Sequence, residues 1–139
     1  MLTIMRTSNR LRLALLGTGF LTFLWLGLED NTTLSVTALG TLIGILVILT
    51  TIRTYAPRGP LTMRLWLPGF VLTGALMGGC AIVFTITLMF FKTAWHSHAF
   101  PDYPVPLMAD MLTRLPVWML GGVIIGAGLG LWRWTRQNW

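Results

Sequence analysis

Four long apolar stretches divide this chain, and the charged residues between them are sorted by sign. The four acidic residues lie in the first and third connections and are Glu29, Asp30, Asp102 and Asp110. Eight basic residues lie in the N-terminal arm, the second connection and the C-terminal tail; they are Arg6, Arg10, Arg12, Arg53, Arg58, Arg64, Arg133 and Arg136. Because basic residues gather on the cytoplasmic side of membrane proteins, the alternation predicts a chain that crosses a bilayer with a fixed orientation.

Each apolar stretch is long enough to cross a membrane as a helix. The predicted transmembrane helices are residues 11–28, 34–52, 65–91 and 115–132. A helix needs about 20 apolar residues to span the hydrocarbon, where every backbone group must bond within its own segment. Hydrophobic residues make up 55% of the 139 residues, and charged residues only 10%. We therefore predict an all-α fold with one integral membrane domain, residues 1–139, built as a four-helix bundle of two antiparallel hairpins.

The connection between the third and fourth predicted helices, residues 92–114, is the longest. Its second half contains apolar residues at helical spacing, namely Leu107, Met108, Met111 and Leu112. This spacing places them on one face of a short helix. We expect that amphipathic helix to lie flat on the outer surface of the membrane.

The arginine distribution predicts that both termini are cytoplasmic and that residues 92–114 face outward. The expected location is an integral, multi-pass protein of a bacterial plasma (inner) membrane or a photosynthetic membrane. Tryptophans near both expected interfaces would anchor the helices at the head groups; they are Trp25, Trp95 and Trp118 on the outer side and Trp66, Trp132 and Trp134 on the inner side. The net charge of +6 would then meet lipid head groups and not nucleic acid.

None of the four predicted spans contains Asp, Glu, Lys, Arg or His in its interior. Proton-coupled exporters need a carboxylate within the membrane, and membrane-embedded hydrolases need a base close to a nucleophile. The sequence therefore argues against both classes and predicts a protein that is not an enzyme and has no cofactor.

Glycines recur every fourth residue in three of the predicted spans. The glycines in this pattern are Gly40, Gly44, Gly74, Gly78, Gly122, Gly126 and Gly130. Small residues at this spacing let two helix backbones approach closely. The glycines either pack the helices of the chain against each other or, in particular at Gly122 to Gly130, dock another subunit, a flat pigment or a lipid.

His96 and His98 are the weak candidates for metal ligands, with Asp102 or Asp110 available to complete an N/O set. The alternatives are an exposed polar loop and a pH-sensitive contact to a partner. Two histidines without a second spaced pair fall short of a metal-binding signature.

The sequence favours a non-catalytic accessory or assembly subunit that packs against a larger membrane complex. Its partners would be the lipid bilayer and either other membrane subunits or further copies of itself. The alternative is a small homo-oligomeric channel, carrier or lipid-handling protein whose path is lined by threonines or backbone carbonyls. A membrane enzyme would have to gather His96, His98, Asp102 and Asp110 at the outer surface.

Overall fold

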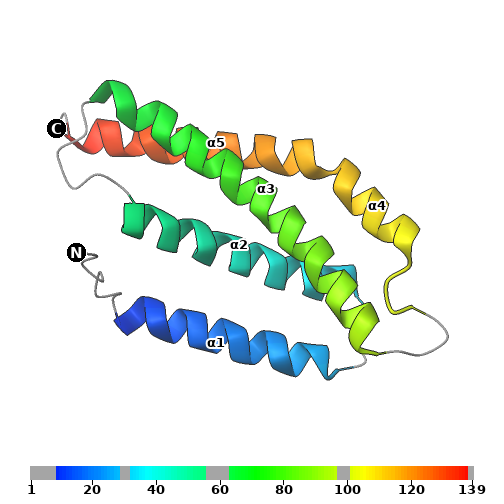
Figure 1. The fold of residues 1–139 in the computed structure, drawn as a ribbon. Helices are drawn as coiled ribbons and strands as arrows, with labels where there is room; N and C mark the ends of the chain where they lie inside the picture. Colours follow the sequence, from blue (N-terminus) through cyan, green and yellow to red (C-terminus); the bar gives the residue numbers. More distant parts are fainter. Residues whose placement is uncertain (1–8, 29–31, 56–62, 97–100, 138–139) are drawn as a thin grey trace.

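A computed structural model describes the chain except for residues 1–8, 29–31, 56–62, 97–100 and 138–139, and within the helices it leaves the side chains of residues 55, 63–65 and 137 undescribed. Its five helices are α1 (Asn9–Leu26), α2 (Thr33–Tyr55), α3 (Met63–Trp95), α4 (Val105–Thr113) and α5 (Leu115–Gln137). The described part of the chain contains no strand. The predicted all-α fold is therefore confirmed (Figure 1).

Three helices are long and apolar enough to cross a membrane, over Thr33–Thr54, Trp66–Trp95 and Leu115–Arg136. Their length and composition support the prediction of a membrane protein. The first predicted span corresponds to α1, which has 18 residues and is not among these three helices. Its first turn carries Arg10 and Arg12, whose charges lower the hydropathy of so short a helix.

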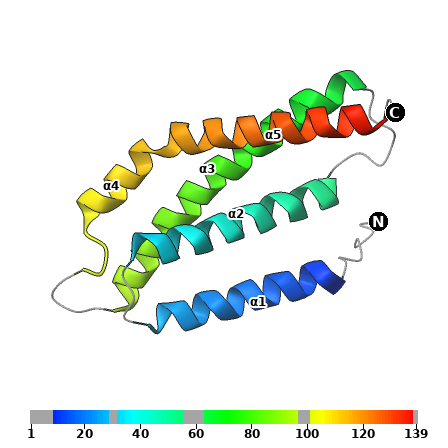
Figure 2. The same cartoon turned by 180° about the vertical axis from the view of Figure 1, so that it is seen from behind.

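The long helices pack in the order α1, α2, α3 and α5, with α3 between α2 and α5 (Figures 1 and 2). The end where α1 and α3 begin is also the end where α2 and α5 finish. We call this the basic end, because its described charged residues are all arginines: Arg10, Arg12, Arg53, Arg133 and Arg136.

The helix α3 is longer than predicted. It continues past Phe91 to Trp95, so Lys92 belongs to this helix and not to the predicted loop, residues 92–114. At 1.5 Å per residue its 33 residues extend about 50 Å, which exceeds a hydrocarbon thickness of roughly 30 Å. One or both ends of α3 must therefore project beyond the hydrocarbon or the helix must tilt.

The short helix α4 lies beside the far end of α3 and leads into α5 with a bend (Figures 1 and 2). Only Arg114 separates the two helices, and its carbonyl accepts a hydrogen bond from the Trp118 N–H at 3.1 Å. Pro116 explains the bend, because it lacks an N–H and its ring clashes with the preceding turn. Together α4 and α5 follow α3 along most of its length.

The apolar face of α4 is only partly turned away from the protein. Leu107, Met108 and Met111 pack against the buried core, whereas Leu112 is 54% exposed. Of the four residues that the sequence places on one face, three therefore contact the protein core and one lies at the surface.

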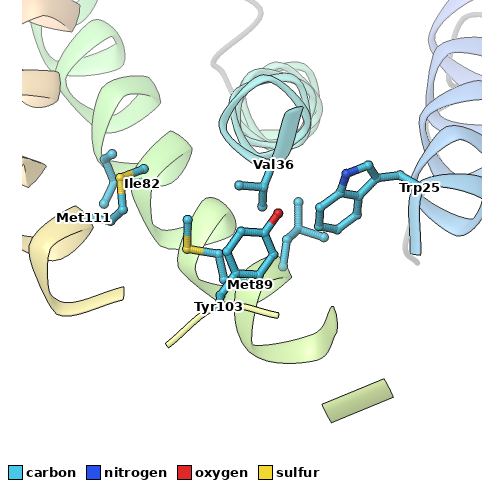
Figure 3. Close-up of a cluster of buried hydrophobic side chains, with 7 residues drawn as sticks. Trp25, Val36, Ile82, Met89, Tyr103 and Met111 are labelled. Atoms are coloured by element: carbon cyan, nitrogen blue, oxygen red, sulfur yellow. The ribbon is translucent and has the colours of Figure 1, made fainter. Parts of the chain in front are cut away.

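The buried core lies at the end opposite the basic end. It consists of Trp25, Val36, Ile82, Leu88, Met89, Tyr103 and Met111. Figure 3 shows Trp25 of α1 and Tyr103 of the loop pointing toward Val36 of α2. Side chains from every helix except α5 meet there, with Leu115 and Trp118 of α5 packed against the cluster.

Candidate functional site

The glycines of α3 and α5 bring these two backbones into direct contact. A Cβ atom on Gly74 would collide with the Gly122 carbonyl, and one on Gly126 would collide with the Phe70 carbonyl. Gly78 faces the Trp118 carbonyl in the same way. Any larger residue at these positions would push the helices apart, so van der Waals packing of the backbones holds the pair together.

A second glycine contact joins α2 to α3. A Cβ atom on Gly40 would lie 2.8 Å from the Cα atom of Thr85, and one on Gly44 would lie 3.0 Å from the Ala81 nitrogen. Gly130 is less tightly enclosed, because a Cβ there would meet a side-chain carbon of Leu67 at 3.0 Å. All seven predicted packing glycines therefore face another helix of the same chain.

The face formed by Gly122, Gly126 and Gly130 is thus occupied largely by α3. The open glycines are others: a Cβ atom on Gly121 or Gly128 would have no neighbour within 4 Å. Neither position belongs to the four-residue spacing, so the sequence pattern does not identify them.

Gly121 lines an apolar groove of about 370 Å³ between α2 and α5. Residues of α3 form its floor, and the two flanking helices form its walls. The lining residues are Thr41, Ile45, Gly74, Met77, Gly78, Ala81, Val117, Trp118, Gly121, Gly122 and Ile125. None of the described residues that line this groove is charged. It is therefore suited to an apolar helix or hydrocarbon chain and not to a polar substrate.

A buried polar cluster connects the helices at the end opposite the basic end, and Lys92 is its charged member. The Lys92 side chain is fully buried, and Nζ lies 4.2 Å from the centroid of the Trp25 ring. Nζ also donates a hydrogen bond to the Trp25 carbonyl at 3.5 Å. The last carbonyls of a helix lack partners within it and carry partial negative charge, so Lys92 stabilises the end of α1.

This position corrects the expectation that Lys92 lies in an exposed outer loop. The sequence does not reveal its burial, because the prediction ended the helix at the last residue of an apolar run. The pairing of Lys92 with Trp25 spans 67 residues of sequence and depends on how the helices meet.

Hydrogen bonds extend the cluster from α1 to α2 and to the loop before α4. Trp25 Nε1 donates to Ser35 Oγ at 3.2 Å, and Ser35 Oγ donates to the Thr32 carbonyl at 3.0 Å. The buried Tyr103 donates its hydroxyl proton to the same carbonyl at 3.2 Å. The start of α2 is therefore held by both neighbouring segments.

His96 and Asp102 form a close pair beside this cluster. His96 Nδ1 lies 2.6 Å from Asp102 Oδ2, and both side chains are mostly buried. Asp110 instead pairs with Arg114 on the exposed side of α4, and His98 lies outside the described residues. Among the described residues, no three His, Cys, Asp or Glu side chains come together to hold a metal ion.

The tryptophans proposed as membrane anchors occupy different environments. Trp25 is only 5% exposed and belongs to the core, and Trp118 packs against that core. Trp95, Trp132 and Trp134 are exposed, and Trp66 is half-buried at the basic end. Trp25 therefore contacts protein more than lipid, because Lys92 and Ser35 approach it from two sides.

Comparison with known proteins gives no relative for this chain: no protein family matches it, and no curated protein or solved structure shows significant similarity to it.

Proposed function

We propose that this chain is a non-catalytic assembly subunit that receives a transmembrane helix of a larger membrane complex in the groove between α2 and α5. The groove is the observation that carries the proposal. It lies within the three helices that can span a membrane, and its lining is almost entirely apolar.

The shape of the groove favours a helix as its occupant. A Cβ atom on Gly121, in the α5 wall, would have no neighbour within 4 Å, so an incoming backbone can approach α5 closely at this position. The α5 wall contributes Val117, Gly121 and Ile125, and the first and last of these are exposed. An apolar helix that filled this space would gain the van der Waals contacts that drive helix association in lipid.

The proposal includes α1 as a fourth span. Its 18 residues extend about 27 Å, which approaches the thickness of the hydrocarbon. The resulting four-span, multi-pass arrangement would have both termini in the cytoplasm of a bacterial inner membrane or on the equivalent side of a photosynthetic membrane. The gathering of arginines at the basic end supports this orientation.

In this orientation α4 would lie at the outer interface. Val105 and Leu112, which are 74% and 54% exposed, would contact the head-group region. Labelling of single cysteines at Val105 and Arg136 with a membrane-impermeant reagent, in a Cys80→Ala background, tests both assignments. Labelling of residue 136 from the outside would contradict them.

The groove is tested by site-specific photo-crosslinking in the native membrane. Ile125 lines the groove, whereas the adjacent Ile124 does not, although both side chains are about equally exposed at 65% and 64%. We expect a crosslinker at position 125 to capture a helix of another subunit and one at position 124 to capture mainly lipid. Lipid adducts alone at both positions would reject the assembly role, and capture of a second copy of this chain would favour the homo-oligomeric alternative.

A substitution separates assembly from folding. In Gly121→Leu, the new side chain would enter the groove, and its Cβ atom would have no neighbour within 4 Å. Gly128→Leu provides the matched control, because Gly128 is equally open but lies outside the groove. We expect Gly121→Leu to abolish the crosslink from position 125 and to leave the chain folded. Retention of that crosslink would contradict occupation of the groove by a helix.

A further inference from the structure

Two arginines stack on tryptophans at the basic end, where α3 begins and α5 finishes. The guanidinium carbon of Arg133 lies 3.9 Å from the centroid of Trp66, and that of Arg136 lies 4.4 Å from the centroid of Trp132. A guanidinium that stacks through its face still presents its N–H donors around its edge. Both side chains are therefore oriented by an aromatic ring and able to bind an anion.

Neither Arg133 nor Arg136 forms an ion pair within the described residues. In the sequence, Glu29 and Asp30 follow α1, whereas Asp102 precedes α4 and Asp110 lies within it, so no acidic residue belongs to the start of α3 or the end of α5. Residues three apart on a helix lie side by side, so the two positive charges act on the same region.

An apolar crevice of about 280 Å³ adjoins the two charges. It is lined by Phe70 of α3 and by Leu129, Trp132, Arg133 and Arg136 of α5. The site thus combines an apolar wall with two guanidinium groups, at the end of helices that are long and apolar enough to span a membrane. A phospholipid has this combination of chemistry, because its acyl chains are apolar and its phosphate is negative.

We infer that this crevice is a binding site for an anionic phospholipid, with the phosphate at Arg133 and Arg136 and an acyl chain against Phe70 and Leu129. Charge complementarity selects the anionic class, since the ammonium group of a zwitterionic lipid would offset the attraction. Trp132 also suits this depth, because its amphipathic ring favours the head-group level. The crevice is separate from the groove that ends at Ile125, so this inference does not depend on the assembly role.

The test compares lipid binding by the full chain in detergent. Phosphatidylglycerol, phosphatidylcholine and inorganic phosphate are titrated separately, and thermal stabilisation and lipid adducts in native mass spectrometry are measured. We expect selective binding of phosphatidylglycerol. We also expect its affinity to fall roughly thirtyfold in the Arg133→Gln/Arg136→Gln variant, since each surface arginine contributes a factor of about five to six and the two factors multiply.

The matched control is Arg10→Gln/Arg12→Gln, which removes the same charge from α1 at the same end. This variant should retain selective binding. An equal loss of phosphatidylglycerol affinity in both variants would show non-specific attraction and overturn the site. Equal binding of phosphatidylglycerol and phosphatidylcholine, or equal thermal stabilisation by inorganic phosphate, would also overturn it. If the α5 variant fails to fold, the test uses the lipid selectivity of the unmodified chain and the Leu129→Trp variant, whose larger side chain fills the crevice. Unchanged phosphatidylglycerol binding by Leu129→Trp would reject the site.

Discussion

The contact between α3 and α5 differs sharply from the contact between α1 and α2. In the first pair, glycines let the backbones touch at several successive turns. In the second pair, a gap of about 390 Å³ remains, lined by residues of both helices. Both pairs are antiparallel neighbours in space, so the relative direction of the helices does not explain the difference (Figure 1).

The difference lies in how each helix meets its neighbour. The buried residues of α1 are Leu11, Thr18 and Trp25, which form a single stripe at seven-residue intervals. Lipid is as apolar as these side chains, so burial alone contributes little to helix association in a membrane. The polar cluster around Trp25 therefore has to supply much of the attachment of α1, whereas α3 and α5 are held by close packing.

The largest expected effect comes from Gly126→Leu, which breaks the close pair. The new Cβ would overlap the Phe70 carbonyl, so α3 and α5 must separate. We expect a loss of about 3 kcal/mol or more in stability, seen as a lower unfolding temperature in detergent. Gly128→Leu, on the open side of α5, should change stability by much less. Similar unfolding temperatures for the two variants would contradict the backbone contact.

An intermediate effect is expected for Lys92→Met, which weakens the attachment of α1. The substitution removes the contact with the Trp25 ring and the hydrogen bond to its carbonyl, at a cost of about 2 kcal/mol. Hydrogen exchange should become faster in the second half of α1 and remain unchanged where α3 and α5 touch. Phe91→Met, at an exposed neighbouring position, serves as the control. Unchanged exchange in α1 would show that the stripe alone holds this helix.

The smallest effect is expected for Gly19→Ala in α1. Gly19 lines the gap, and a Cβ atom there would have no neighbour within 4 Å. The change should alter stability by less than about 1 kcal/mol, in the stabilising direction, because alanine favours a helix more than glycine does. The unfolding temperature measures this effect. A clear destabilisation would mean that α1 and α2 pack more closely than the gap indicates.

The sequence predicted the helices better than their environments. The apolar runs located α2, α3 and α5 to within a few residues, because a span must be long and apolar wherever it lies. The end of α3 was wrong, since Lys92 continues the helix and is buried by residues distant in sequence. The glycine spacing identified positions that face another helix, but it did not indicate that Gly121, which lies outside the pattern, borders an open groove.

The sequence by itself determined the helical class, the membrane character and the sorting of charges between the two ends. These properties follow from local composition, because solvent and lipid act on each segment independently. Only the tertiary structure decided that Lys92 joins Trp25, that the glycines pack within the chain, and that an apolar groove remains open beside Gly121. Those features depend on the relative rotation and separation of whole helices, which hydropathy does not encode.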